Sequence, residues 1–203
     1  MNRIITGEEA RSIIRKGVDE TANIVKLTYG AKGRNVIVAR PHMLPYITKD
    51  GVTVAKEAML DDEIANIGAY LIKQVAARTD DGVHDGTTSS TILAQAIVNE
   101  ADSMLKQGVN PVYVKRGIDK AMEFAVKKLK TLSTRIKTNT ELRNIATICA
   151  NGDKEIGKLI AEIYKKTGKD RVIKVEEGLT TATTVEYTKG YEIDNRFFIW
   201  GFI

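Results

Sequence analysis

Residues 80–91, which read DDGVHDGTTSST, join two stretches of helical periodicity and form the most informative pattern in this sequence. The acidic half, Asp80–Gly86, is typical of a turn, and the hydroxyl-rich half, Thr87–Thr91, is typical of the first turn of a helix. Such a first turn carries unpaired backbone amides and a partial positive charge, so it readily binds an anion. Asp85 offers the hard oxygen ligand that Mg²⁺ prefers when it bridges phosphates. The pattern is compatible with a nucleotide-phosphate site, although taken alone such hydroxyls more often only cap a helix.

Two other loops add residues of the same chemistry. Thr28–Arg34, TYGAKGR, follows a predicted helix, and its glycines would let the backbone approach a ligand closely. Thr48–Gly51, TKDG, supplies a cation and a second carboxylate. One aspartate on a metal and another near the attacking water would suit phosphoryl transfer. Each loop alone is more often merely a turn, so the hypothesis depends on all three occurring in one helical region.

Along the rest of the chain, the apolar spacing predicts a mainly α-helical fold with small β elements. Thr6–Glu9 reads as a Thr-x-x-Glu capping box that opens a first helix, which is expected to end at Tyr29–Gly30. Residues 35–39 and 46–48 are predicted strands on either side of a proline-bounded turn. Lys49–Gly51 is predicted to be a tight turn.

Three more helices are expected before residue 133. The first of these helices is expected to pack through one apolar face, whose residues are given below. The second is expected to start after Gly86 and to continue to about Leu105. The third starts at Asn110–Pro111, a cap followed by the helical position that tolerates proline. The face of the first helix consists of Ile64, Ile67, Gly68, Leu71, Ile72 and Val75. The third helix is expected to bury Val114, Ile118, Met122, Val126 and Leu129.

Beyond residue 133 a mixed α/β segment is expected. Thr138–Glu141 is a second capping box before a short helix, and another helix is predicted from about 153 to 167. Residues 171–175 and 183–187 are predicted strands. The last seven residues, 197–203, are almost wholly apolar, which favours a piece of a longer chain over an exposed partner site.

Composition excludes several classes of protein. The 203 residues are 43% hydrophobic, enough for a packed core, and the single cysteine excludes a disulfide-stapled secreted fold. No run approaches the roughly 18 apolar residues of a membrane span, and no signal-peptide core is present, so a cytoplasmic protein is expected. The net charge of +5 is of mixed sign along helical faces, which makes nucleic acid an unlikely partner.

Rival motifs are incomplete. Gly152–Lys158 imitates the start of a P-loop, but Leu159 stands where Ser or Thr should hold Mg²⁺. His42 and His84 are far apart in the sequence and no nucleophile motif accompanies them. Cys149 has apolar neighbours and is interpreted as a small core residue rather than a nucleophile.

Several short motifs occur here in the order found in group I chaperonin subunits of the GroEL type, and the chain resembles the N-terminal portion of such a subunit from about residue 7 onward. The motifs are Lys32–Val36, Ile47–Val52, Asp85–Thr88, Leu93–Ile97, Lys115–Ala121 and Gly157–Ala161.

The resemblance implies an ATP-driven protein-folding machine built from stacked seven-membered homo-oligomeric rings. Its partners would be unfolded polypeptide clients, with a co-chaperonin as a further candidate partner. Residues 1–132 would form the N-terminal half of the equatorial ATP-binding domain. Residues 133–188 would form the first segment of the intermediate hinge domain, and 189–203 the truncated start of the apical domain. The strands at 35–39 and 46–48 would pair with a neighbouring subunit through an open sheet edge.

The resemblance also assigns roles to single residues. The nucleotide and Mg²⁺ would be bound by three groups: Thr28, Tyr29, Gly30 and Ala31; Lys49, Asp50 and Gly51; and Asp85, Gly86, Thr87, Thr88 and Ser89. Mg²⁺ would sit on Asp85, and Asp50 matches an aspartate that assists hydrolysis. Tyr29 and Ala31 replace the usual Leu and Pro, and Ser89 replaces a Thr but keeps a hydroxyl.

The rest of a chaperonin subunit, including a further hydrolytic aspartate, is absent from these 203 residues, so weak or absent ATP turnover is expected of this chain alone. Two alternatives to an ATP-dependent subunit stay open. One is a non-catalytic module that associates with full-length chaperonin rings, and the other is a basic helical nucleic-acid binder.

Overall fold

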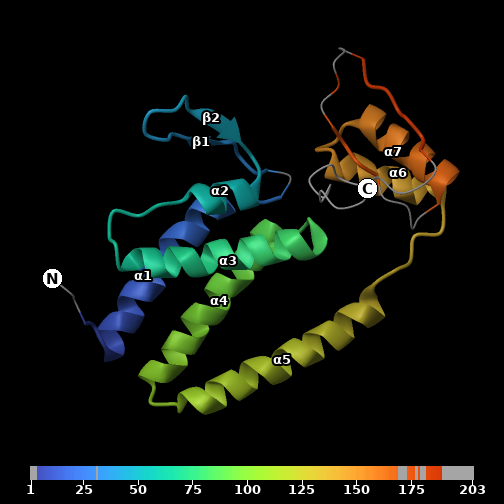
Figure 1. Ribbon diagram of the computed structural model, residues 1–203. Coiled ribbons are helices and arrows are strands. Elements are labelled where there is room, and N and C mark those ends of the chain that lie inside the picture. The colour runs from blue at the N-terminus through green and yellow to red at the C-terminus, as the bar shows by residue number, and fades with distance from the viewer. Residues whose placement is uncertain (1–3, 31, 169–172, 177, 179–181, 189–203) are drawn as a thin grey trace, which may run out of the picture. The chain divides into compact units, whose positions relative to one another are not determined.

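The computed structural model describes residues 4–30, 32–168, 173–176, 178 and 182–188 (Figure 1). The chain divides into two compact units, residues 1–133 and 134–203. The described residues form helices and one two-stranded antiparallel sheet, which confirms the expected mainly α-helical class with small β elements. None of the described helices is long and apolar enough to cross a membrane.

The first unit is built around three helices, α1 (Gly7–Lys26), α3 (Ala65–Val83) and α4 (Thr87–Lys106). Its core has two clusters. One joins Val18 and Ala22 of α1 to Ile72 of α3, and the other joins Val25 to the short helix α2 (Gly51–Glu57) and to Ala76. α1 and α3 cross so closely that a Cβ at Gly17 would lie 1.8 Å from the Ala65 carbonyl oxygen.

This close crossing changes which face of α3 is buried. The buried residues are the small ones and Ile72, whereas Ile67 and Leu71, expected on the core face, are 52% and 44% exposed. Large side chains cannot fit where two backbones nearly touch, so the glycine and alanine positions face inward. The buried set is Ala65, Gly68, Ala69, Ile72 and Ala76.

Two expectations at helix starts are wrong. Thr6 is the N-cap of α1, but its side chain makes no capping hydrogen bond; Gly7, next along the chain, has φ of 66°, in the left-handed region rather than the helical one. Lys49–Gly51 is not a free-standing tight turn, because Asp50 caps α2. Asp followed three residues later by Thr53 in a run of small and β-branched residues is a helix start that hydrophobic periodicity alone does not reveal.

The predicted strands before residue 50 are present as β1 (Val36–Val38) and β2 (Tyr46–Thr48). They pair antiparallel, with Ile37 opposite Ile47. Val36 packs against the α2 cluster and Val38 is buried, while Ile37 and Ile47 are 70% and 67% exposed. Figure 1 shows this hairpin beside α2, so the hairpin and α2 together position the residues between them.

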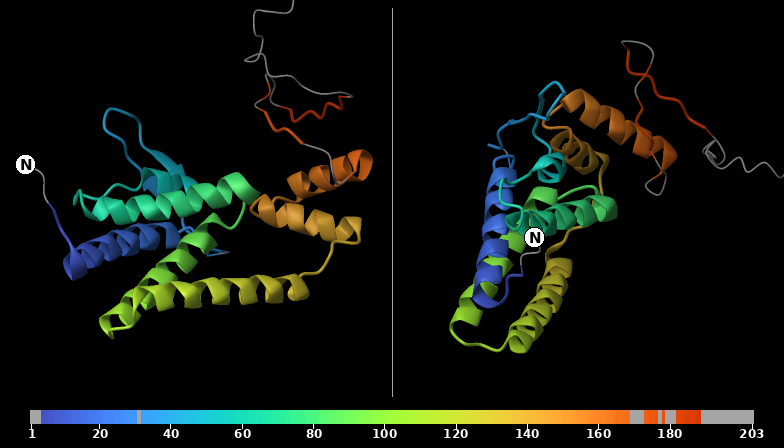
Figure 2. Two further views of the ribbon diagram at one scale, coloured as in Figure 1. Left: turned by 60° about the horizontal axis from the view of Figure 1, so that its bottom comes forward. Right: turned by 60° about the vertical axis from the view of Figure 1, so that its left-hand side comes forward.

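The long helix α5 (Pro111–Leu132) starts as predicted, with the Asn110 side chain accepting a hydrogen bond from the Val112 amide. Its expected core face is not buried. Val114 is 9% exposed, but Met122 and Leu129 are 59% and 63% exposed, and Ile118 and Val126 are also exposed. Figures 1 and 2 show why: α4 and α5 meet at the turn between them and then diverge, so α4 covers only the first part of α5.

The second unit contains a helical hairpin of α6 (Asn139–Cys149) and α7 (Lys154–Thr167), which lie side by side in Figure 2. The capping box at Thr138 and Glu141 is present as predicted. The tight turn between the helices places Asn151 and Gly152 at φ of 53° and 94°. A Cβ at Gly157 would lie 2.1 Å from the Thr147 hydroxyl oxygen, so α6 and α7 touch at this glycine.

Two further predictions for this unit are corrected. Residues 173–175 and 183–187 are not strands, because a strand requires pairing into a sheet and the sheet among the described residues consists of β1 and β2. Cys149 is exposed at the end of α6 and is not a core residue, because α6 packs on α7 through a different face that includes Ala146. Residues 171–172 and the apolar 197–203 lie outside the described residues.

Candidate functional site

Three segments distant in sequence meet at the residues that the sequence singled out. The Thr28 and Thr88 hydroxyl oxygens are 3.2 Å apart and share a hydrogen bond. A Cβ at Gly51 would lie 2.1 Å from the Thr88 hydroxyl and 3.4 Å from the Thr28 hydroxyl. The end of α1, the start of α2 and the first turn of α4 are therefore in direct contact.

The first of these segments is a loop that folds back on itself. Thr28 is 6% exposed and donates its hydroxyl to the Val25 carbonyl at 2.8 Å. The Arg34 amide donates to the Leu27 carbonyl, and a Cβ at Gly33 would lie 2.3 Å from the Thr28 carbonyl oxygen. The loop is thus held at its base while Tyr29 and Gly30 remain exposed. Ala31 lies outside the described residues.

The second segment fixes the carboxylate of Asp50. Its Oδ2 accepts hydrogen bonds from the Thr53 amide at 2.8 Å and the Thr53 hydroxyl at 2.5 Å. None of the described residues donates to Oδ1, and Asp50 is exposed. The neighbouring Lys49 is half-buried. Asp50 is therefore held in one orientation with one carboxylate oxygen left for a ligand or water.

The third segment is the turn into α4, which has no side-chain cap. Its N-cap is Gly86 with φ of 75°, and the Asp85 carboxylate accepts the Gly86 amide at 2.6 Å. Ser90 is the first residue of α4 whose amide finds a helical acceptor, the Gly86 carbonyl. Within the part of the chain that the structure describes, the amides of residues 87–89 have no assigned acceptor. This helix start has the donors that an anion needs.

The hydroxyls of this turn divide between structural and available groups. The Thr88 hydroxyl is taken up by Thr28, and the fully buried Thr91 hydroxyl donates to the Thr88 carbonyl at 2.8 Å. The Ser90 hydroxyl donates to the Thr87 carbonyl. The half-buried Thr87 and Ser89 hydroxyls have no such bond among the described residues. The backbone amides, more than the hydroxyls, are the donors of this turn.

Sequence reasoning missed a cluster next to the site. Arg40, which follows β1, donates from Nε to Glu57 Oε2 at 2.8 Å and from Nη2 to Glu57 Oε1. Nη2 also contacts the Tyr46 hydroxyl at 3.3 Å, and the guanidinium lies 5.3 Å from the Tyr46 ring centre. Hydrogen bonding to Glu57 raises the pKa of Arg40 above its usual value, so the guanidinium stays protonated. The 17-residue separation of Arg40 and Glu57 gives no local signal of this contact.

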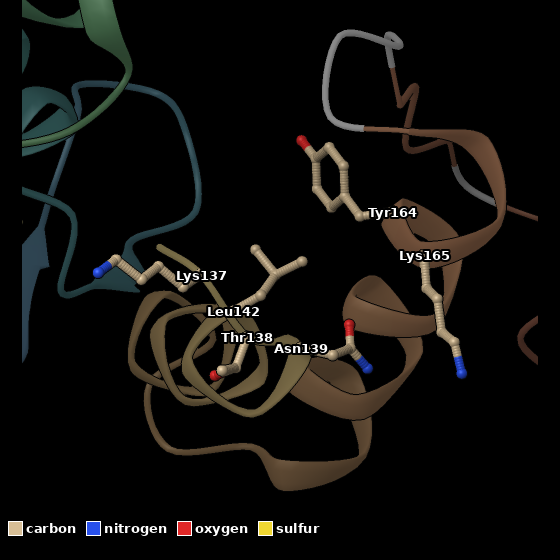
Figure 3. Close-up of a pocket in the computed structure, with 6 residues that line it drawn as sticks. All are labelled: Lys137, Thr138, Asn139, Leu142, Tyr164 and Lys165. Carbon is tan, nitrogen blue, oxygen red and sulfur yellow. The ribbon is translucent and has the colours of Figure 1, made fainter. Parts of the chain in front are cut away.

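A small pocket in the second unit does not resemble a phosphate site. It is lined by Lys137, Thr138, Asn139, Leu142, Tyr164 and Lys165. Figure 3 shows the side chains of Lys137 and Lys165 pointing away from each other. The amides of Lys137 and Thr138 already donate to the Glu141 carboxylate. Neither charge nor free amides converge on this pocket.

Comparison with known proteins identifies a matching family and two solved structures of similar fold. The sequence pattern of the TCP-1/cpn60 chaperonin family matches residues 21–199. The fold is similar to two crystal forms of the chaperonin gp146 from the bacteriophage EL 2 (Pseudomonas aeruginosa), both determined in the presence of ATP-BeFx. For form II the TM-score is 0.73 with 26% identity over 87% of this chain and 31% of that chain. For form I the TM-score is 0.72 with 26% identity over 87% of this chain and 32% of that chain.

This chain spans about a third of the length of gp146. The family pattern covers both compact units and includes all three segments that meet at Thr28, Gly51 and Thr88. On this evidence the chain belongs to the TCP-1/cpn60 chaperonin family.

Proposed function

We propose that this chain is the nucleotide-binding part of a chaperonin subunit that assists protein folding, and that it binds Mg·ATP where the Thr28 loop, α2 and α4 meet. The observation that carries the proposal is the contact of Thr28, Gly51 and Thr88 beside an uncapped helix start. The gp146 crystals, which contain a similar fold, were obtained with an ATP analogue. The uncapped helix start supports an anion site, and the ATP analogue in the gp146 crystals favours a nucleotide as that anion.

Each residue of the site has a definite role in this proposal. The amides of Thr87, Thr88 and Ser89 donate to phosphate oxygens, and Lys49 balances their charge. Asp85 and Gly86 shape the turn, and Asp85 would hold Mg²⁺, which would supply positive charge to neutralise the phosphates. Among the described residues no group of three metal-ligating side chains gathers, so most Mg²⁺ ligands would be phosphate and water oxygens. Thr28, Tyr29, Gly30 and Ala31 line the nucleotide.

Asp50 is the proposed catalytic residue. Because Thr53 occupies Oδ2, the other oxygen, Oδ1, can accept a hydrogen bond from the attacking water and orient it. The next residue, Gly51, packs against the first turn of α4, where a Cβ would collide with Thr88. The carboxylate and the phosphate-binding turn can thus act on the same ligand.

The wider assignments rest on the family. Residues 1–132 correspond to half of an equatorial domain, 133–188 to part of an intermediate domain and 189–203 to the start of an apical domain. Stacked seven-membered rings, unfolded clients, a co-chaperonin and a cytoplasmic setting belong to the same proposal. The exposed Ile37 and Ile47 on the outer face of the hairpin support subunit contacts there.

A second candidate is a non-catalytic module that joins chaperonin rings. The observation that favours it is the exposed apolar side of α5, where Met122 and Leu129 are each more than half exposed. Such a surface suits association with other subunits. A nucleic-acid role has no comparable structural support.

Calorimetric titration with ATP, with and without Mg²⁺, tests the proposal. We expect Mg²⁺-dependent binding that disappears in Asp85→Ala and survives in the matched control Asp81→Ala, which removes an exposed carboxylate near the end of α3. Equal loss in both variants, or no binding by the unaltered chain, would contradict it. Co-assembly with full-length rings without a nucleotide effect would favour the second candidate. DNA binding that falls steeply with salt would favour a nucleic-acid role.

A further inference from the structure

Asp50 lies in the middle of one short continuous segment whose two ends meet. The segment Tyr46–Glu57 consists of β2, the two residues Lys49 and Asp50, and α2. Tyr46 is its first residue and Glu57 its last. Arg40 contacts both, through the Tyr46 hydroxyl at 3.3 Å and through two bonds to the Glu57 carboxylate.

The segment cannot hold its shape by local forces. A helix of seven residues is far below the roughly 12 residues at which isolated helices become even marginal. A pair of three-residue strands is equally weak on its own. The orientation of Asp50 therefore depends on the tertiary contacts that fix the strand and the helix relative to each other.

Two sets of contacts fix them. Val52, Val54 and Ala55 anchor one face of α2 in the core. Val36 of β1 packs against the same cluster and holds the hairpin on α2, but this apolar cluster does not include Glu57 at the end of α2 or Tyr46 at the start of β2. Arg40 closes this gap, because its planar guanidinium binds the Glu57 carboxylate through two parallel bonds and lies against the Tyr46 ring at the same time.

We infer that Arg40 is a positioning residue for Asp50: by tying Tyr46 to Glu57 it sets the geometry of the strand–turn–helix segment that presents the carboxylate. This inference rests on the proposed function, which gives Asp50 its task. Arg40 does not itself touch the nucleotide, since Glu57 lies at the far end of α2, about 10 Å from Asp50 at the helical rise. Its effect reaches the site through α2.

The inference predicts a local signature at Thr53, whose amide donates to Asp50 Oδ2. In Arg40→Gln we expect amide hydrogen exchange of Thr53 to accelerate about tenfold, while exchange in the α1–α3 core, at Val18 and Ile72, stays unchanged. Mg·ATP affinity should fall about three- to tenfold because the carboxylate is displaced. A general loss of stability would instead accelerate exchange at all three amides.

A variant cycle tests whether Arg40 acts through Glu57. We expect the same acceleration of Thr53 amide hydrogen exchange in Arg40→Gln, in Glu57→Gln and in the double variant, because each of them removes the same contact between Arg40 and Glu57. The matched control is Lys115→Gln, which removes an equal charge from an exposed ion pair with Asp119 on α5. It should change neither the Thr53 exchange rate nor the Mg·ATP affinity. The inference would be overturned if the effects of the two substitutions on Thr53 exchange added up in the double variant, or if Thr53 exchange were unchanged in Arg40→Gln.

Two further outcomes of these experiments also test the inference: a failure of Arg40→Gln to fold, and an absence of Mg·ATP binding by the unaltered chain. If Arg40→Gln does not fold, Arg40→Lys takes its place, because lysine keeps the charge without the two parallel bonds. We expect it to accelerate Thr53 amide exchange to an intermediate degree. Exchange at the wild-type rate would overturn the inference. If the unaltered chain binds no Mg·ATP, the proposed function fails, but the Thr53 readout still decides whether Arg40 positions Asp50.

Discussion

The glycine at position 51 shows how strongly one residue can control this site. Its Cα lies so close to the first turn of α4 that an added Cβ would be 2.1 Å from the Thr88 hydroxyl oxygen and 3.3 Å from the Thr88 Cβ. Thr88 cannot easily move aside, because its hydroxyl bonds Thr28 and its carbonyl accepts from the buried Thr91. A side chain at position 51 would therefore separate α2 from α4.

For Gly51→Ala we expect a loss of about 1–3 kcal/mol in the free energy of unfolding, from overpacking, together with weaker Mg·ATP binding. Urea denaturation and nucleotide titration measure the two effects. Gly117→Ala in α5 is the control: open space surrounds that position, so alanine should stabilise the helix by about 0.5–1 kcal/mol. Removing the obstructing hydroxyl in Gly51→Ala/Thr88→Ala should recover part of the loss. No recovery would mean that the clash is not with Thr88.

At the scale of elements, α1 and α4 pack through polar groups as well as apolar ones. Asp19 Oδ1 accepts from Gln95 Nε2 at 2.6 Å and from Asn99 Nδ2 at 2.8 Å. One turn further along α4, the buried Asp102 is paired with Arg15 and Lys106. These contacts fix the register of α4 on α1, and α4 carries the phosphate-binding turn at its start.

Asp19→Ala should lower the free energy of unfolding by about 1–3 kcal/mol, because it leaves the Asn99 side-chain amide without its acceptor and the Gln95 side-chain amide with only the Asn23 Oδ1 acceptor at 3.2 Å. The adjacent Glu20→Ala, which removes an exposed partner of Lys16, should cost less than about 1 kcal/mol. Chemical denaturation of the two variants side by side makes the comparison. Equal effects would show that the α1–α4 contact does not depend on Asp19.

The helix α5 offers the opposite case, an apolar face that its own unit leaves uncovered. Met122→Gln should change the free energy of unfolding of this chain by no more than about 0.5 kcal/mol, since Met122 is 59% exposed. Ile72→Ala, in the core at 1% exposure, should cost about 2–5 kcal/mol. A large effect of Met122→Gln, measured by the same denaturation, would show that another chain or copy covers α5 in solution.

For the whole molecule, we expect nucleotide binding without appreciable turnover. The proposed site supplies Asp50 and Asp85, while the chain spans only about a third of the length of gp146. Phosphate release by the purified chain under excess Mg·ATP measures turnover, and the expected rate is close to the rate without protein. Steady-state release that is abolished by Asp50→Ala would contradict this prediction.

The sequence supported the family, the helical class and most element positions. Apolar periodicity located α1, α3 and α4, and short-range cap signals at Asn110 and Thr138 located the starts of α5 and α6. It failed where neighbours decide the outcome. α2 is too short to show a period, and residues 183–187 have strand-forming side chains but no strand partner among the described residues.

What the sequence determined by itself is therefore the local chemistry: which residues can cap a helix, accept a metal or donate to a phosphate. Only the tertiary structure decided which of them meet. The bond between Thr28 and Thr88 joins residues 60 positions apart, and the tie between Arg40 and Glu57 spans 17. Contacts of this kind depend on how closely the backbones of α1, α2, α3 and α4 approach, which is set by packing across the whole first unit and leaves no periodic trace in the chain.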